Sequence, residues 1–258
     1  MITAASNSRV KRLVQLNQKA KLRREENVFL AEGAKMFLEA PAEKLREVYV
    51  SESFLAKCSF RERLEQTGYE VVSDAVFARI SDTCTPQGIL CVLEQFHYQP
   101  EELFRKKAPL LLFLENIQDP GNLGTMLRTG EGAGVDGVIM SGDTVDLYNP
   151  KVIRSTMGSV YRVPFFYAAD FKEAVCRAKA AGVSVYAAHL RGKDSYGQQD
   201  YRSGTGFLIG NEGNGLREET AALADTYIRI PMEGRVESLN AAVAAAVLMY
   251  EAHRQRSR

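Results

Sequence analysis

Three segments in the second half of the chain combine polar side chains with turns that could bring those side chains together. An apolar run at residues 207–209 leads into a glycine-rich loop at 210–215, and a second apolar run spans 228–232. Residues 238–240 then open an alanine-rich helix that we expect to reach about His253. Ligands bind at loops that follow the carboxyl ends of parallel strands. The order of these segments therefore predicts one ligand site.

A fourth polar stretch, residues 116–129, follows a continuous apolar run at 110–114. Such a run is typical of a strand that is buried on both faces. Asn122 can cap the helix that follows, and Arg128 lies six residues further along it. A surface salt bridge is the ordinary role for Arg128, and a function for it needs further support.

The other candidate residues also have ordinary structural interpretations. The loop 210–215 lacks the lysine of a phosphate-binding P-loop, so it can be a plain turn. Ser238 can be a helix cap and Leu239 a core residue. Residues 132–137 match the pattern G-x-G-x-x-G, but they end a helix and open a strand, which favours a helix C-cap over a dinucleotide site.

Composition limits the class of protein. The chain has 258 residues, of which 45% are hydrophobic, and no run approaches the roughly 20 apolar residues of a membrane span. The first residues lack an apolar signal core, so we expect a cytoplasmic protein. The four cysteines and three histidines have no metal-ligand spacing, which predicts buried free thiols and no metal; they are Cys58, Cys84, Cys91, Cys176, His97, His189 and His253.

Charge is unevenly distributed along the chain. The net charge is only +1, but residues 1–24 contain basic side chains and no acidic one. This distribution is compatible with binding to a nucleic-acid backbone, and a solvated helix face is the alternative. We expect Ser6 or Ser8 to cap a first helix with Val10, Leu13 and Val14 on its apolar side. The basic residues are Arg9, Lys11, Arg12, Lys19, Lys21, Arg23 and Arg24.

The alternation of apolar and polar segments predicts an α/β protein with two domains. Residues 1–97 read as a small α/β domain with a basic N-terminal helix, 98–108 as a polar linker, and 109–258 as a second domain with a mostly parallel sheet. The strands we expect in the first are 28–31, 48–50, 70–73 and 89–93, with helices at 34–39 and 60–66. In the second we expect strands at 110–114, 135–140, 163–166, 183–188, 207–209 and 228–232.

Three phrases in fixed order resemble a known family. LENIQDPGNLGTMLRT, GNEGNGL and IPMEGRVESLNAAVA are similar to the three motifs of the SpoU (TrmH-type) RNA ribose 2′-O-methyltransferases. FLAEGAKMFLEA and SDTCTPQG resemble, more weakly, the family's ribosomal-protein-like RNA-binding domain. The resemblance implies a SPOUT methyltransferase domain with a trefoil knot, S-adenosylmethionine as cofactor, and a homodimer whose facing subunit completes each site. It implies 2′-O-methylation of a ribose in structured RNA, with ribosomal RNA favoured over transfer RNA.

The resemblance also assigns site residues. The catalytic positions would be Arg128, Asn122, Glu212, Ser238 and Asn240, and the cofactor would contact Gly210, Asn211, Gly213, Ile230, Met232 and Leu239. A guanidinium stays protonated, so Arg128 suits binding of a phosphate or stabilisation of a developing alkoxide better than proton removal. Two other functions remain open: an RNA-binding or ribosome-assembly protein without turnover, and an NAD-linked oxidoreductase based on the glycine pattern.

Overall fold

The computed structural model describes residues 1–104 and 106–257. The chain forms two compact units, one of residues 1–96 with 146–161 and one of 97–145 with 162–258. The segment 146–161 therefore packs with the first unit, although it lies within the sequence of the second expected domain. The expected linker 98–108 and the expected domain 109–258 each include one residue outside the described part, Arg105 and Arg258.

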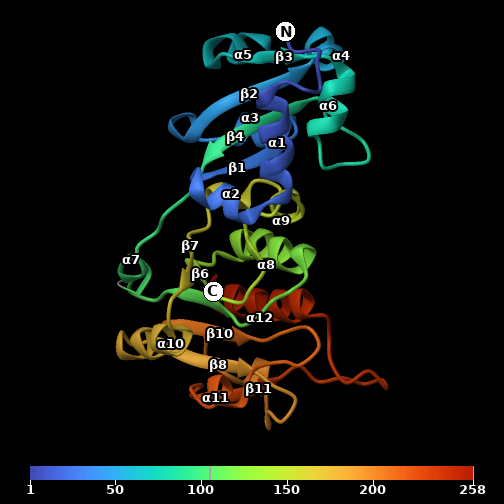
Figure 1. The fold of residues 1–258 in the computed structure, drawn as a ribbon. Coiled ribbons are helices and arrows are strands. Elements are labelled where there is room, and N and C mark those ends of the chain that lie inside the picture. Colours follow the sequence, from blue (N-terminus) through green and yellow to red (C-terminus); the bar gives the residue numbers. More distant parts are fainter. Residues whose placement is uncertain (105, 258) are drawn as a thin grey trace. The chain divides into compact units, whose positions relative to one another are not determined.

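The first unit is built on a four-stranded sheet in the order β1-β4-β2-β3. The strands are β1 (Val28–Glu32), β2 (Leu45–Ser51), β3 (Glu70–Val72) and β4 (Ile89–Glu94), which confirms the four strands expected from the sequence. β4 pairs antiparallel with β1 and β2, whereas β2 and β3 are parallel. Its helices are α1 (Ser8–Gln18), α2 (Ala20–Glu25), α3 (Ala34–Glu39), α4 (Glu52–Lys57), α5 (Arg61–Thr67), α6 (Asp74–Ile80) and α9 (Pro150–Thr156), with 3-10 turns η1 (Ala42–Lys44) and η2 (Ser159–Tyr161) (Figure 1).

The first helix differs from expectation at its cap. Asn7 is the N-cap, because its side chain accepts a hydrogen bond from the Arg9 backbone at 2.9 Å; Ser6 and Ser8 do not have this role. The apolar side of α1 is confirmed, since Val10, Leu13 and Leu16 are buried in the core of the unit, while Val14 is only partly buried.

The second unit contains a seven-stranded sheet in which every pairing is parallel, in the order β7-β6-β5-β10-β8-β11-β9. This confirms the parallel α/β class. The strands are β5 (Leu110–Leu114), β6 (Gly137–Ser141), β7 (Phe165–Ala168), β8 (Ser184–Ala188), β9 (Asp194–Ser195), β10 (Thr205–Ile209) and β11 (Thr226–Arg229). β10 inserts between β5 and β8, both earlier in the chain. The trefoil knot stays a prediction.

Helices cover both faces of this sheet. α10 (Phe171–Ala180) and α11 (Glu218–Ala221) pack on the face that carries Leu111 and Phe113. Alternate residues of a strand point to opposite faces, so Leu110, Leu112 and Leu114 point to the other. α8 (Pro120–Ala133) and α12 (Ala241–Arg256) pack against each other, and α12 also contacts β10; Figure 1 shows α8 and α12 side by side.

Local details of the chain differ from expectation in some places and agree in others. The polar linker contains a short helix, α7 (Pro100–Phe104), because Leu103 and Phe104 are buried. β11 ends at Arg229, so residues 230–232 lie in the loop after it. Only Cys91 is a buried thiol, while Cys84 and Cys176 are exposed. Gly134 has a positive φ of 78° at the end of α8, which confirms the helix C-cap.

The strand order fixes where a ligand can approach. β6 and β7 lie on one side of β5, whereas β10 and the remaining strands lie on the other. After β5 the chain continues toward β6 and β7, and after β10 it continues toward β11, in the opposite direction along the sheet. The gap between β5 and β10 is therefore a topological switch point, where open α/β sheets bind ligands. Among the described residues, no helix is long and apolar enough to cross a membrane.

Candidate active site

The loop after β5 is held in a defined conformation by its neighbours. Asn116 has a left-handed backbone, with φ of 54°, and its N–H donates to the Ser141 hydroxyl at 2.8 Å. The Ile117 N–H donates to the Thr144 hydroxyl at 3.3 Å. Both hydroxyls come from the end of β6 and the loop that follows it. Hydrogen bonds thus hold the loop after β5 against the carboxyl end of β6.

The start of α8 explains why Asn122 is available for other contacts. Asp119, not Asn122, caps the helix, and its carboxylate accepts from the Asn122 N–H at 2.8 Å. Pro120 occupies the first helical turn, where its missing N–H costs nothing. The Asn122 amide is therefore free to donate to Glu212 at 3.0 Å and to accept from the Asn240 amide at 3.0 Å.

Glu212 connects the loop after β10 to the loop after β5. Its carboxylate accepts from the N–H groups of Gln118 and Asp119 at 3.1 and 3.0 Å, in addition to Asn122. Burial acts to raise the pKa of Glu212, but the hydrogen bonds from Asn122 and the two backbone N–H groups outweigh it, and the pKa is lowered. The side chain is a carboxylate at neutral pH.

The glycine-rich loop is shaped by its own backbone. Asn211 and Gly215 exchange backbone hydrogen bonds of 3.0 and 2.9 Å, and the Asn211 amide donates to the Asn116 carbonyl at 2.8 Å. A Cβ at Gly210 would lie 2.2 Å from backbone atoms of Gly215 and Leu216. Only glycine fits there, so this loop is more than a plain turn.

Asn240 adds the third segment. It caps α12, because its side-chain oxygen accepts from the Ala242 and Val243 N–H groups at 2.9 and 3.3 Å; the expected cap Ser238 lies outside the helix. The Asn240 NH2 group donates to Asn122. The chain Glu212–Asn122–Asn240 therefore joins the loops after β5 and β10 to the start of α12. That these segments form one ligand site with residues 228–232 stays a prediction.

Arg128 lies elsewhere on α8. At about 100° per residue, six residues place it about 240° around the helix from Asn122, so the two side chains face different directions. Arg128 is exposed and forms no hydrogen bond or ion pair with any residue that the structure describes. Ser238 is exposed and Leu239 half-buried in the loop that precedes α12. A single chain thus does not bring Arg128 into the hydrogen-bonded chain.

A cavity of about 610 Å³ opens beside the loop after β11. This volume is within the range of about 300–1,000 Å³ that is usual for small-molecule sites. Two of the expected cofactor residues, Ile230 and Met232, line it, together with the charged loop 233–237 and the side chains of Leu190 and Arg229.

Two family models match this chain. The model of the SpoU rRNA Methylase family matches residues 109–250, and that of the MRM3-like substrate binding domain matches residues 7–91. The chain belongs to the SpoU methylase family. It is 34% identical over 252 residues, 96% of this chain and 97% of the relative, to the 23S rRNA (guanosine(2553)-2′-O)-methyltransferase RlmP of Bacillus subtilis.

Solved SpoU structures are similar throughout. The AdoMet-bound rRNA methyltransferase from Sinorhizobium meliloti has a TM-score of 0.86 and 32% identity, covering 98% of this chain and 97% of that one. The SpoU methyltransferase AviRb from Streptomyces viridochromogenes, in complex with the cofactor AdoMet, has a TM-score of 0.87 and 26% identity, covering 97% and 98%. The match includes both compact units.

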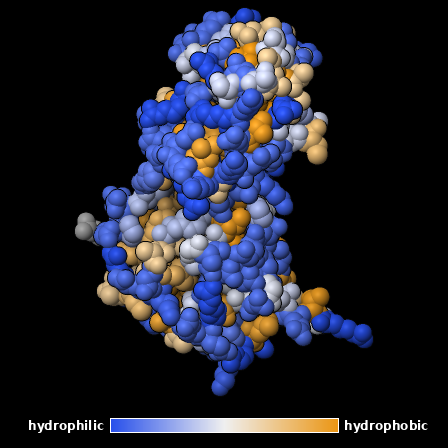
Figure 2. Space-filling model, in the orientation of Figure 1, coloured by the Kyte–Doolittle hydropathy of each residue, from blue (hydrophilic) through white to orange (hydrophobic). Residues whose placement is uncertain are grey.

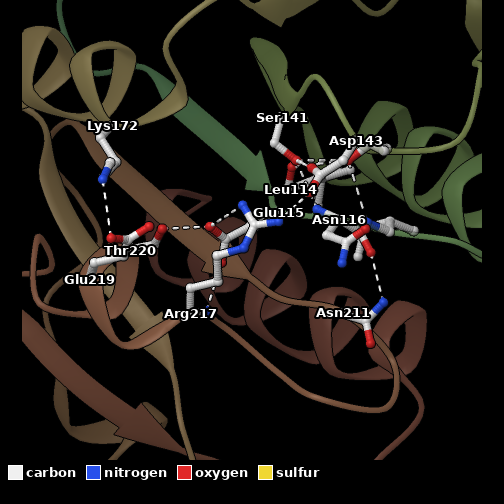
Figure 3. A network of polar contacts seen from close by, with 12 residues as sticks. Leu114, Glu115, Asn116, Ser141, Asp143, Lys172, Asn211, Arg217, Glu219 and Thr220 are labelled. Atoms are coloured by element: carbon white, nitrogen blue, oxygen red, sulfur yellow. Dashed lines mark hydrogen bonds and ion pairs between the residues drawn. The ribbon is translucent and has the colours of Figure 1, made fainter.

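The sequence analysis missed a second network in this SpoU chain, shown in Figure 3. Glu115, 2% exposed, accepts from the Arg217 N–H at 2.8 Å and from the Thr220 hydroxyl. The Arg217 guanidinium also pairs with Asp143 in the loop after β6. The signal was an acidic residue directly after a buried apolar strand. This network fixes the segment that follows the glycine-rich loop.

No cluster of metal-ligating side chains occurs within residues 1–104 and 106–257.

Proposed function

We propose that this chain transfers a methyl group from S-adenosylmethionine to a ribose 2′-hydroxyl of structured RNA, with ribosomal RNA favoured over transfer RNA. The observation that carries the proposal is the hydrogen-bonded chain Glu212–Asn122–Asn240, which joins the loops after β5 and β10 to the start of α12. The similarity to a Bacillus subtilis 23S rRNA 2′-O-methyltransferase over nearly the full length supports ribosomal RNA as the substrate.

The residues present fit the cofactor. S-adenosylmethionine supplies a methyl group on a cationic sulfonium, and the ionised Glu212 carboxylate is compatible with a positive charge nearby. Backbone groups of Gly210, Ile230 and Leu239 would hold the adenosine, and Asn211, Gly213 and Met232 would border it. Gly210 supports this arrangement, because a side chain there would displace the backbone of the loop.

The polar side chains then align and activate a weakly acidic alcohol. Asn122 and Asn240 orient the loops, and Ser238 would contact the substrate near the transferred methyl group. Arg128 would bind the phosphate beside the target ribose or stabilise the developing alkoxide. Because Arg128 and Asn122 face different directions on α8, Arg128 serves the site of a second copy in a homodimer.

The first unit would hold the RNA through phosphate and shape contacts. Not every basic residue near the N-terminus is free for this role. Arg23 is 3% exposed and pairs with Asp146 at 2.5 Å, so it anchors the segment 146–161, and Arg12 pairs with Glu26 and Glu47. Lys11, Lys19 and Arg24 remain as exposed candidates for RNA phosphates. Such work on RNA would take place in the cytoplasm.

The test is methyl transfer from labelled S-adenosylmethionine to RNA from cells that lack the protein, followed by mapping of the 2′-O-methyl position. We expect one ribose to be labelled. Calorimetry separates the alternatives: no heat with millimolar S-adenosylmethionine would favour an RNA-binding protein without turnover, and binding of a nicotinamide cofactor would favour an oxidoreductase. Sedimentation at micromolar concentration should report a dimer, and an active monomer would contradict the shared site.

A further inference from the structure

The basic side chains of the second unit differ in whether they have partners. Most form ion pairs, as Arg162 does with Glu131 and Lys179 with Asp225. The side chains of Lys193, Arg229 and Arg235 form no ion pair or hydrogen bond with any other residue in the described part of the chain. All three are exposed. Cations of this kind are available to an external anion without first breaking an internal bond.

These three cations gather at one place on the unit. Lys193 directly precedes β9, and β9 pairs with β11 so that Ser195 lies opposite Arg229. The chain around Lys193 also approaches closely, since a Cβ at Gly192 would lie 3.0 Å from the Arg229 backbone nitrogen. Arg229 and Arg235 both line the cavity beside the expected cofactor residues. We name Lys193, Arg229 and Arg235 the basic rim.

Apolar side chains accompany the basic rim. Leu190 and Val236 line the same cavity and are 62% and 63% exposed. Figure 1 shows the segment between β11 and α12 as an extended loop that reaches away from the sheet, and Figure 2 shows it with strongly hydrophilic residues at its end. Exposed cations suit the backbone phosphates of a single strand, and exposed aliphatic side chains can pack on the apolar face of an unpaired base.

Acidic residues of the loop restrict where an anion can bind. Glu233 and Glu237 also line the cavity, and neither forms an ion pair with the basic rim. The cavity lining therefore carries two carboxylates and two guanidinium groups, so a phosphate is repelled near Glu233 and Glu237 and attracted near Arg229 and Arg235. Phosphates are therefore attracted to the basic rim and away from the two carboxylates.

We propose that the basic rim binds the backbone phosphates of the RNA strand next to the target nucleotide, with Leu190 and Val236 contacting an adjacent base. This inference rests on the proposed function. It places an RNA site on the methyltransferase unit itself, whereas the match to a substrate binding domain covers only residues 7–91. RNA is thus held by both units.

The test compares two triple variants. In the first, K193A, R229A and R235A are combined. The control combines R177A, R202A and R254A, which removes the same charge from ion-paired positions in the same unit. With RNA from cells that lack the protein, the rim variant should raise KM for RNA at least tenfold, while kcat and S-adenosylmethionine affinity stay within a few-fold. The control should keep KM for RNA near wild type.

The salt dependence of RNA binding gives an independent measurement. Each lost phosphate contact on a single strand reduces the slope of log K against log salt by about 0.7, so three contacts reduce it by about 2. An unchanged slope and KM in the rim variant would overturn the proposal. Weaker S-adenosylmethionine binding with unchanged RNA binding would also overturn it, because the rim would then hold the cofactor. Thermal melting verifies that both variants are folded.

Failure of the proposed function gives a different result. If the wild-type protein methylates no RNA, the proposed function is wrong, and filter binding still reports whether the basic rim contributes to RNA affinity. If the wild-type protein methylates RNA and the rim variant behaves like the wild type in every measurement, the proposed function stands and this inference alone is wrong.

Discussion

The substitution Asn122→Asp tests the hydrogen-bonded chain most directly. Asp is nearly the same shape as Asn, so packing is preserved. The change replaces the amide that donates to Glu212 at 3.0 Å with a carboxylate oxygen. Two carboxylates then face each other, while the bond from Asn240 to the Asn122 side-chain oxygen can persist. The variant isolates the charge of one contact.

The magnitude follows from the distance. The repulsion between two unit charges 3 Å apart is on the order of 1 kcal/mol in water and on the order of 5 kcal/mol near a protein surface. Glu212 is exposed, so solvent screening favours the lower end, about 1–2 kcal/mol. We expect a loss of methyl-transfer rate of about 5- to 30-fold at pH 7.5. The melting temperature should fall by about 2–8 °C.

The pH dependence of stability separates this mechanism from a packing defect. In the wild type the lowered pKa of Glu212 contributes stability that is present above its unfolded pKa and lost as pH falls through the folded pKa. In the variant, repulsion raises the pKa of one carboxyl, so its contribution is present at low pH and lost as pH rises. The difference in melting temperature between the two proteins should therefore grow from pH 5 to pH 8.

A matched control is Asn149→Asp in the first unit. Asn149 caps α9 by accepting from the Lys151 N–H at 2.9 Å, and a negative charge at a helix N-terminus is favourable. This control should melt within about 1 °C of the wild type at pH 7.5. If Asn122→Asp destabilises the protein equally at pH 5 and pH 8, repulsion of Glu212 is not the cause and the reasoning is refuted.

Three further substitutions test other parts of the site. Arg128→Ala should reduce methyl transfer at least 100-fold while S-adenosylmethionine affinity, measured by calorimetry, stays within a few-fold; near-normal activity would reject its role at the ribose. Gly210→Ala should weaken cofactor binding at least tenfold, because the new Cβ meets backbone at 2.2 Å, whereas Gly197→Ala, where a Cβ has no neighbour within 4 Å, should not. Arg23→Ala leaves Asp146 without its buried partner and should cost about 3–5 kcal/mol in chemical denaturation; a loss under 1 kcal/mol would show that the pair is not structural.

Periodicity and apolar runs predicted most strands of both sheets, but not β9, which no apolar run marks. The run 110–114 lies in a buried strand, because a strand covered on both faces tolerates continuous apolar sequence. The run 228–232 is an exception, since β11 ends at Arg229. The short helices were harder to predict. α7 lies in a stretch that reads as a linker, and its two buried residues, Leu103 and Phe104, give no helical period. The association of residues 146–161 with the first unit depends on tertiary contacts that no local pattern contains.

Helix caps were the part of the site most poorly predicted. Each expected cap had a competitor one to three residues away with an equally suitable side chain, as with Asp119 beside Asn122 and Asn240 beside Ser238. Backbone geometry decides between such neighbours, and sequence does not reveal it. The difference matters, because Asn122 can reach both Glu212 and Asn240 only when Asp119 caps α8.

The position of Arg128 is compatible with the proposed homodimer. Arg128 is on α8, and α12 packs against α8. Val243 and Tyr250, two turns apart on α12, are each 49% exposed, and a Cβ at Gly132 of α8 would lie 3.0 Å from the Tyr250 hydroxyl. Exposed apolar side chains on two adjoining helices would lose contact with water if a partner covered them, and this burial would stabilise a complex. If that partner is a second copy, the proposed shared site would place Arg128 of one copy at the hydrogen-bonded chain of the other, which agrees with the separation of Arg128 from Asn122 within one chain.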